Sequence, residues 1–292
     1  MASNWLKMRF NGRRFGEPGP PTRKFRFPFS HRGETTRSLR RLEFVQSAYS
    51  VDSIHVMAKP NVIELPGCGP IPILHEDRSV IAMDKPRGWM LAPVSWQKTS
   101  RNLQAAIESS VAARDFWSRS RGLKFLRHVH RLDTDTSGVL LFAKSPGAVE
   151  RFFDLFESRK MEKTYLAVAV GEPGENEWTC RLKLAPDKKR FHKMKVDADH
   201  GKNCETHFKV LERCKRLTLI EARPVTGRTH QIRVHLAESG LPIVGDELYG
   251  MREGRLPLGL RAVRLAYMDP FTKRRVEIHA PTEEFLKEFG FA

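Results

Sequence analysis

The sequence has no apolar run of the roughly eighteen residues that a membrane-spanning helix needs. Its first residues also lack the short apolar stretch of a secretory signal. The few cysteines stand singly, without a CxxC pair, which argues against a disulfide framework and is typical of reduced cytosolic thiols. They are Cys68, Cys180, Cys204 and Cys214. We therefore expect a cytoplasmic protein with no membrane partner.

Acidic residues are also scarce relative to basic ones. Lys and Arg total 51 against 34 Asp and Glu, a formal net charge of +17 over 292 residues. Such an excess favours a polyanionic partner, because each cation near a phosphate releases condensed counterions. Apolar residues make up 40% of the chain, which is enough for a sizeable core. The composition therefore indicates a globular protein that binds nucleic acid.

The first 42 residues hold eleven Lys and Arg but only two acidic residues. The stretch "GEPGPPTRKFRFPFSHRGE" is rich in Pro and Gly and has no sustained period, which predicts a flexible basic arm. Its alternating Phe and Arg could stack on bases and pair with phosphates. A tail without a specific role and an organelle-targeting peptide remain alternatives. We predict a flexible basic extension over residues 1–60 and an ordered domain over residues 61–292.

Within the ordered domain, expected strands outnumber expected helices and do not alternate with them regularly. Proline ends the first clear strand, "VIAMDKP", and Ser145 followed by Pro146 is typical of a helix start. Gly240 and Gly290 are expected to end the helices in "THQIRVHLAESG" and "TEEFLKEFG", the second of which begins at Thr282. Further strands are expected in "GVLLFAK", "TYLAVAV", "THFKVLE", "RLTLIEA", "AVRLAYM" and "RVEIHA". The pattern predicts an α+β fold with a mixed, mostly antiparallel sheet flanked by helices and loops.

The densest cluster of reactive side chains is "HVHRLDTDTSG", which precedes an expected buried strand. One interpretation is a metal site, because His128 and His130 face the same way on a strand and Asp133 lies nearby. Such a site needs more ligands. His230 and His235 could supply them, but five residues apart on a helix they do not share a face well.

Two other interpretations concern the carboxylates of this segment. Asp133 and Asp135 could act as a general acid and base, as in glycosidases. Alternatively, Asp133 alone could be a nucleophile held by a neighbouring cation. Asp135, followed by Thr, Ser and Gly, has the composition of a tight turn.

The third interpretation agrees with a family resemblance. "HRLDTDTSG" resembles the HRLDxxTSG signature of RluA/RluD-type RNA pseudouridine synthases, in which the Asp is the nucleophile. Three further segments, in the order found in that family, are similar to its other motifs. They are "MDKPRGWMLAP", "MEKTYLAVAVGE" and "PVTGRTHQIRVHLAESGLPIVGDELYG".

The resemblance implies the pseudouridine synthase fold, with residues 61–292 as the catalytic domain. It implies an isomerase that converts uridine to pseudouridine in structured RNA, ribosomal or transfer, without a cofactor or a metal. It also implies a monomer.

The resemblance also implies roles for individual residues. Asp133 is the nucleophile, Arg233 pairs with it and fixes its direction, and Tyr165 lies under the target base. Arg131 fills the stack that the flipped uridine leaves. Arg228 and His230 lie at an expected helix N-terminus and hold backbone phosphate. Lys85 is expected to brace a turn.

The sequence departs from the family pattern in places. Ala92 stands where the family's first motif has His, and a late Arg-x-x-Leu-His-Ala segment is present only as "GLRAVRLAYMDP". The small RNA-binding domain that often precedes the catalytic domain is not recognisable in the first 60 residues. A metal-dependent hydrolase and a catalytically silent RNA-binding protein remain the competing functions.

Overall fold

A computed structural model describes residues 59–91, 101–190, 192–250 and 256–291. The predicted basic arm and the departure at Ala92 lie outside these residues. The described chain from Lys59 onward belongs to one compact unit. No helix in it is long and apolar enough to cross a bilayer.

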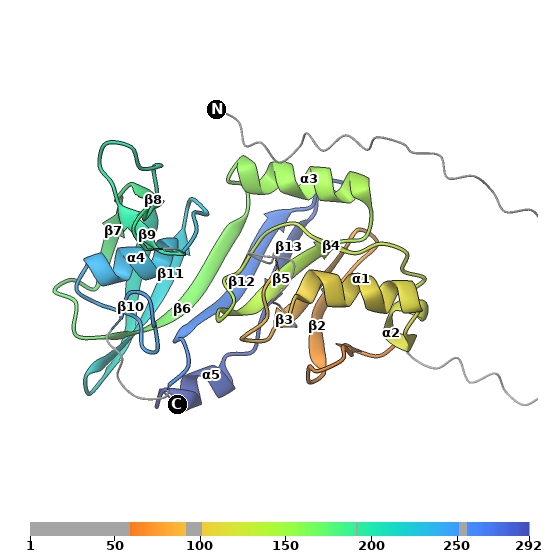
Figure 1. Ribbon diagram of the computed structural model, residues 1–292, viewed down its shortest axis with the longest axis horizontal. Helices are drawn as coiled ribbons and strands as arrows, with labels where there is room; N and C mark the ends of the chain where they lie inside the picture. The colour runs from red at the N-terminus through yellow and green to blue at the C-terminus, as the bar shows by residue number, and fades with distance from the viewer. Residues whose placement is uncertain (1–58, 92–100, 191, 251–255, 292) are drawn as a thin grey trace, which may run out of the picture. The chain divides into compact units, whose positions relative to one another are not determined.

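The described residues form five helices and thirteen strands (Figure 1). The helices are α1 (Leu103–Ala113), α2 (Phe116–Arg119), α3 (Pro146–Glu157), α4 (Gln231–Glu238) and α5 (Glu283–Glu288). The first strands are β1 (Val62–Ile63), β2 (Ile71–Glu76), β3 (Val80–Lys85), β4 (Arg127–His128), β5 (Ser137–Ala143), β6 (Glu162–Val170) and β7 (Glu177–Cys180). The later strands are β8 (Leu184–Pro186), β9 (Met194–Val196), β10 (Thr206–Cys214), β11 (Leu217–Pro224), β12 (Leu260–Met268) and β13 (Arg275–His279).

Eleven of the described strands form one sheet with the main order β1-β2-β3-β5-β12-β6-β11-β10-β7. Strand β4 pairs with β5, and β13 pairs with β12. The pairing of β5 with β12 is parallel, whereas the other pairings between the strands of this sheet are antiparallel. The predicted α+β fold with a mixed, mostly antiparallel sheet is therefore confirmed.

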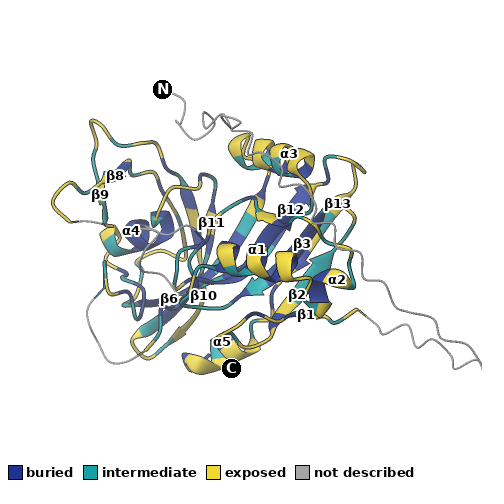
Figure 2. Ribbon diagram, turned by 45° about the vertical axis from the view of Figure 1, so that its right-hand side comes forward, coloured by how far each residue is buried: buried dark blue, intermediate teal, exposed yellow. Residues whose placement is uncertain are grey.

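In the half of the sheet that contains β3 and β5, alternate side chains pack under different helices. Ile81 and Leu140 belong to one apolar cluster with Leu103 and Ile107 of α1. Their sequence neighbours on β3 and β5 pack with Phe152 of α3 instead. Because successive side chains of a strand point to opposite faces, α1 and α3 cover opposite faces here. The strands are buried, and the outer surfaces of both helices are exposed (Figure 2).

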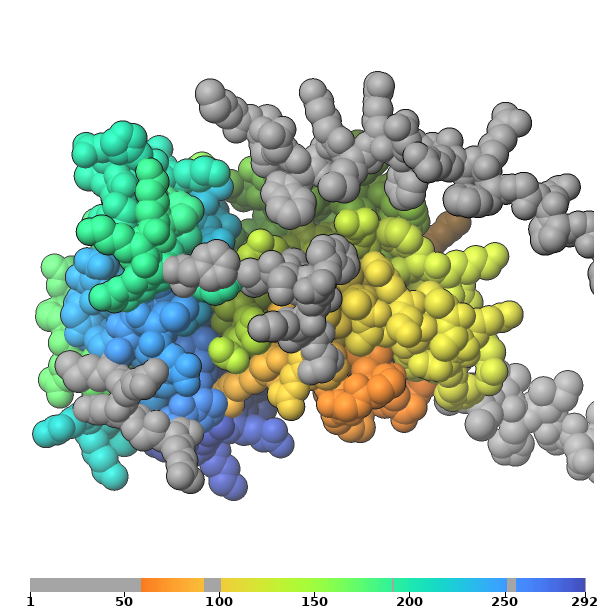
Figure 3. Space-filling view, viewed as in Figure 1, coloured from red at the N-terminus to blue at the C-terminus, as the bar shows by residue number. Residues whose placement is uncertain are grey.

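The half that contains β6 and β11 is covered in the same way. Ala167 and Ala169 pack with α4, whereas Leu166 and Val168 pack with α5. Tyr165 contacts both the cluster under α1 and the cluster under α4, so these two helices share a face of the sheet. Along the length of the sheet, helix α4 and the β8–β9 hairpin lie toward one end, and α1 and α3 lie toward the other (Figure 3).

The helix ends agree with the sequence in most places. The Ser145 side chain accepts a hydrogen bond from the Ala148 backbone N–H at 3.2 Å, as expected for an N-cap. Gly240 follows α4 with φ +74°, and Gly290 follows α5 with φ +80°. Thr282 precedes α5, but its side chain makes no capping hydrogen bond, because its backbone is already helical.

Candidate active site

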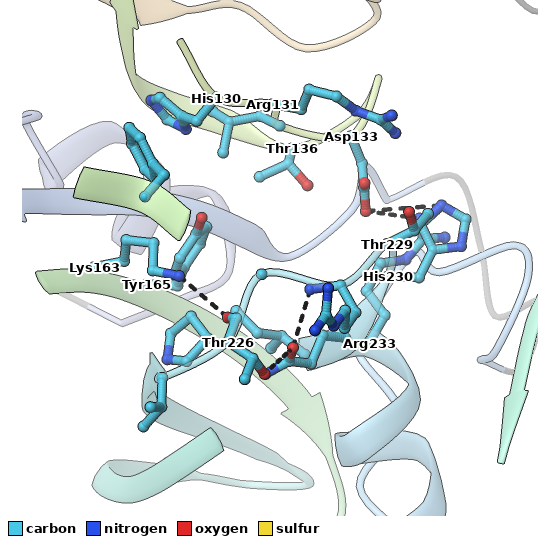
Figure 4. A pocket seen from close by; sticks show the side chains of 18 of the residues that line it. His130, Arg131, Asp133, Thr136, Lys163, Tyr165, Thr226, Thr229, His230 and Arg233 are labelled. Carbon is cyan, nitrogen blue, oxygen red and sulfur yellow. Dashed lines mark hydrogen bonds and ion pairs between the residues drawn. The ribbon is translucent and has the colours of Figure 1, made fainter. Parts of the chain in front are cut away.

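A cavity of about 660 Å³ is lined by four segments and by Leu260 of β12 (Figure 4). The segments are the loop before β5, one side of α3, the start of β6, and the segment that leads from β11 into α4. All six residues that the sequence predicted for the site line this cavity: Arg131, Asp133, Tyr165, Arg228, His230 and Arg233.

A buried lysine shapes the loop that carries Asp133. Lys85 is fully buried, and its Nζ donates to the backbone carbonyls of Pro86, Thr134 and Thr136 at 3.0, 2.8 and 2.9 Å. Burial lowers the pKa of Lys85 to about 8. Since the carbonyls of the loop turn inward onto this lysine, the loop is fixed at its base. The expectation that Lys85 braces a turn is confirmed.

The turn itself separates the two acidic residues. The Thr136 backbone N–H donates to the Asp133 carbonyl at 3.2 Å, which closes a turn over Thr134 and Asp135. Asp135 is exposed and does not line the cavity, whereas the Asp133 side chain is only 22% exposed and does. The carboxylate-pair interpretation is therefore wrong, because the turn directs the two side chains to different surroundings.

Gly138 is needed where the loop enters β5. Its φ is +110°, and a Cβ at this position would lie 2.0 Å from the Ala262 carbonyl oxygen. The residue sits where β5 and β12 pair in parallel, with Gly138 opposite Ala262. Only glycine allows this close approach of the two backbones. The approach brings the Asp133 loop next to the centre of the sheet.

Arg233 on α4 joins Asp133 to a second, deeply buried carboxylate. Its Nη1 lies 3.3 Å from Asp133 Oδ2, while its Nε and Nη2 donate to the two carboxylate oxygens of Asp246 at 2.7 Å each. Burial opposes the charge on Arg233, but the hydrogen bonds and charges of Asp246 and Asp133 raise its pKa above the usual value. A bidentate pair fixes the guanidinium plane, so Arg233 presents one N–H toward Asp133.

Asp246 was not predicted from the sequence. Its side chain is fully buried, and Oδ1 also accepts the backbone N–H groups of Leu248 and Tyr249 at 2.9 and 3.0 Å. Burial raises the pKa of Asp246, but the Arg233 guanidinium outweighs it and holds that pKa below its usual range. The stretch "GDELYG" holds two adjacent acidic residues, Asp246 and Glu247, so nothing in the sequence singles out Asp246.

His230 lies at the N-terminus of α4 with φ +55°. Its Nε2 is 3.8 Å from Asp133 Oδ2, and its Nδ1 is 2.9 Å from the Tyr249 hydroxyl. Burial lowers the pKa of His230, and the nearby Asp133 charge only partly offsets that effect. The Tyr249 hydroxyl also accepts the Met194 backbone N–H at 2.7 Å, which ties the β8–β9 hairpin to the site.

Arg131 and Arg228 are exposed at the rim of the cavity. Neither forms an ion pair with any residue that the structure describes. Arg228 precedes α4, and its backbone N–H donates to Gln231 Oε1 at 3.1 Å. Both side chains are therefore open to a ligand at the rim. The prediction that Arg131 fills the base stack and that Arg228 contacts phosphate at the α4 N-terminus remains a prediction.

The opposite wall consists of Tyr165, Lys163 and His130. Burial, together with the Asp133 charge, raises the pKa of Tyr165. Burial lowers the pKa of Lys163 to about 8, and its Nζ donates to the Thr226 carbonyl at 3.1 Å. His130 stacks on Phe156 with ring centroids 4.7 Å apart, and burial lowers its pKa to about 3.

The histidines proposed for a metal site do not converge. His128 Nδ1 pairs with Gln104 at 2.7 Å, and His130 Nε2 accepts the Leu141 backbone N–H at 3.0 Å. His235 lies 3.0 Å from Thr206 and 3.3 Å from the Leu182 carbonyl, on the far side of α4. In the ranges 59–91, 101–190, 192–250 and 256–291, the one His and carboxylate group with metal-ligand spacing is the Asp197, Asp199 and His200 cluster, outside the cavity. The metal-site interpretation is therefore not supported by the geometry.

Comparisons with known proteins identify the family of this chain. Residues 79–238 match the sequence family described as RNA pseudouridylate synthase. The chain is 36% identical over 227 residues to "Ribosomal large subunit pseudouridine synthase C" of Vibrio vulnificus, covering 74% of this chain and 67% of the relative. It is also 36% identical over 231 residues to the protein of the same name in Escherichia coli, with the same coverage of both chains.

Among solved structures, the chain resembles "Human RNA Pseudouridylate Synthase Domain Containing 1" with a TM-score of 0.58 and 26% identity. The match covers 72% of this chain and 83% of the human one. A second human structure, "Human RNA Pseudouridylate Synthase Domain Containing 4", shares the fold with a TM-score of 0.59 at 21% identity, over 75% and 92% of the two chains.

Proposed function

This chain belongs to the RNA pseudouridylate synthase family, and from that premise we propose that Asp133 is the nucleophile with which it isomerises uridine in folded RNA. The reaction breaks the bond between uracil N1 and the sugar C1′, turns the base, and rejoins it through carbon 5. One observation carries the proposal. The Asp133 carboxylate lies in the cavity, 3.3 Å from an arginine that Asp246 holds in place.

Each neighbour of Asp133 has a separate task in this proposal. Arg233 holds the carboxylate in place, directed into the cavity. Tyr165 lies under the flipped uracil. Arg131 enters the base stack that the uridine leaves, because a base inside a helix is otherwise out of reach. Arg228 and His230, at the α4 N-terminus, hold the phosphates that flank the target.

Large-subunit ribosomal RNA is the substrate that the relatives' names favour. We propose that the enzyme acts as a cytoplasmic monomer and that residues 1–60 form a flexible basic extension that adds phosphate contacts. Pseudouridine mapping of total RNA from cells with and without the protein tests this assignment. Loss of a site in large-subunit RNA is expected. Loss of a transfer-RNA site instead would reassign the substrate.

A pair of variants tests the nucleophile. Asn has nearly the shape of Asp but is a far weaker nucleophile, so Asp133→Asn should retain RNA affinity and lose pseudouridine formation. Asp135→Asn removes a charge from the same loop but from the exposed turn position, so most activity should remain. Release of tritium from carbon 5 of labelled uridine measures both. Equal activity of the two variants would contradict the role of Asp133.

A further inference from the structure

Lys163 places a positive charge in a poorly hydrated part of the cavity. It lies two residues before Tyr165 on β6, so both side chains point to the same face of the sheet, and both line the cavity. Its Nζ donates one hydrogen bond, to the Thr226 carbonyl, and forms no ion pair within the described residues. An ammonium has three N–H groups, so two remain for a ligand.

This arrangement does not favour folding. A half-buried cation without a carboxylate partner costs stability, and an apolar side chain of similar length would avoid that cost. Burial lowers the pKa of Lys163 to about 8, in keeping with this cost. The neighbouring His130 is neutral, so it adds no second positive charge beside Lys163. Unpaired, poorly hydrated charges of this kind are concentrated at functional sites.

The position of Lys163 within the cavity indicates which part of a nucleotide it meets. Lys163 and Tyr165 lie on one side, and Asp133 lies on the other (Figure 4). A sugar held at Asp133 would direct its base toward Tyr165 and Lys163. Phosphates are strongly hydrated and would remain at the rim, where Arg131 and Arg228 are exposed. The group that reaches Lys163 is therefore the uracil ring.

The chemistry of the proposed isomerisation calls for a cation at this point. When the N1–C1′ bond breaks, its electron pair stays with the ring and spreads onto the carbonyl oxygens. The ring then forms the C5–C1′ bond, carbon 5 loses its hydrogen as a proton, and N1 takes up a proton. If Asp133 instead adds to the ring, the carbonyl oxygens also gain charge. A hydrogen-bond donor placed where charge develops lowers the barrier in either case.

Building on the proposed function, we propose that Lys163 is a further catalytic residue, which hydrogen-bonds a carbonyl oxygen of the target uracil and stabilises the ring's negative charge. Lys163 stays protonated throughout and transfers no proton. It differs from Arg131 and Arg228 in acting on the chemical step and not on RNA affinity.

The test compares Lys163→Met with Lys160→Met, which removes the same charge from an exposed position three residues earlier. Single-turnover tritium release and the Kd for substrate RNA are measured for both. Lys163→Met should slow the chemical step by about 10²-fold with unchanged Kd, the loss typical of a removed charge-stabilising donor. Lys160→Met should keep the wild-type rate. A wild-type rate in Lys163→Met, or weaker binding at an unchanged rate, would overturn the proposal.

The pH profile of kcat/KM gives a second measurement, in the wild-type enzyme and in Lys163→Met. The kcat/KM should fall as pH rises above about 8, because free Lys163 then loses its proton. His130 is already neutral there, and burial keeps Tyr165 protonated. Lys85, beneath the Asp133 loop, also has a pKa of about 8, so a fall supports the proposal only where Lys163→Met removes it. A flat profile through this range would overturn the proposal even if Lys163→Met does not fold. Activity in Asp133→Asn would instead overturn the proposed function.

Discussion

The two walls of the cavity differ in how their charged side chains are neutralised. On the α4 wall, Arg233 lies between Asp133 and Asp246, and burial is compensated by ion pairs and backbone donors. On the β6 wall, Lys163 has one carbonyl partner, and burial shifts its pKa strongly. The comparison indicates that the first wall is built to hold one geometry, whereas the second keeps unused hydrogen-bonding capacity for a ligand.

The largest expected loss of stability follows from breaking the Arg233–Asp246 ion pair on the α4 wall. Asp246→Ala leaves the buried Arg233 guanidinium without its bidentate partner, so the free energy of unfolding should fall by about 3–5 kcal/mol. Pseudouridine formation should also fall, because Arg233 can then rotate away from Asp133. Denaturant unfolding and tritium release measure the two effects. Glu288→Gln, which breaks the more exposed Arg87–Glu288 pair, is the matched control and should cost less than about 1 kcal/mol.

On the β6 wall, removal of the Lys163 charge should raise the free energy of unfolding instead of lowering it. The folded chain loses the Lys163 proton at about pH 8, whereas the unfolded chain holds it to about pH 10. The cost of burying this charge is therefore complete below about pH 8 and is relieved as pH rises toward 10. Lys163→Met should be more stable than wild type at neutral pH, by about 1–3 kcal/mol.

That advantage should shrink at alkaline pH, and urea unfolding at a series of pH values measures it. The Lys160→Met control should show no such trend, because Lys160 is exposed in the folded chain. A Lys163→Met variant that is less stable than wild type at every pH would mean that the Lys163–Thr226 hydrogen bond stabilises the fold by more than burial of the charge costs.

A smaller effect is expected at the link between the α4 wall and the β8–β9 hairpin. Tyr249→Phe removes the hydroxyl that accepts the Met194 N–H and contacts His230, so stability should fall by about 1 kcal/mol. Tyr267→Phe is the matched control. The Tyr267 hydroxyl is buried and makes no hydrogen bond with the described residues, so its removal should be neutral or stabilising. Equal losses in thermal unfolding would argue against the link.

Deletion of residues 1–42 is expected to leave the chemistry of both walls unchanged and to affect RNA binding alone. RNA binding should weaken and become less dependent on salt, because phosphate contacts are lost. The single-turnover rate at saturating RNA should not change, since no residue of either wall is removed. Filter binding at several salt concentrations measures the affinity. Unchanged affinity at every salt concentration would show that the arm does not contact RNA.

The sequence by itself determined the order and type of the main elements and six of the residues that line the cavity. Strand alternation, the Ser145 cap and the glycines after α4 and α5 act locally, so they can be recognised without the fold. Asp133, Tyr165 and Arg233 were found because they lie within recognisable motifs. The turn residues that follow Asp133 likewise indicated that Asp135 belongs to a turn.

Only the tertiary structure decided which charges are paired. Asp246 lies thirteen residues from Arg233 in the same family-like segment, but nothing in that segment marks it as the partner of Arg233, so its role depends on α4 packing against the loop that follows it. Lys163 could not be distinguished from an ordinary solvated strand lysine, because its burial depends on the Thr226 loop that folds over β6. Pairing and desolvation are properties of distances between segments, and a sequence specifies those distances only through the complete fold.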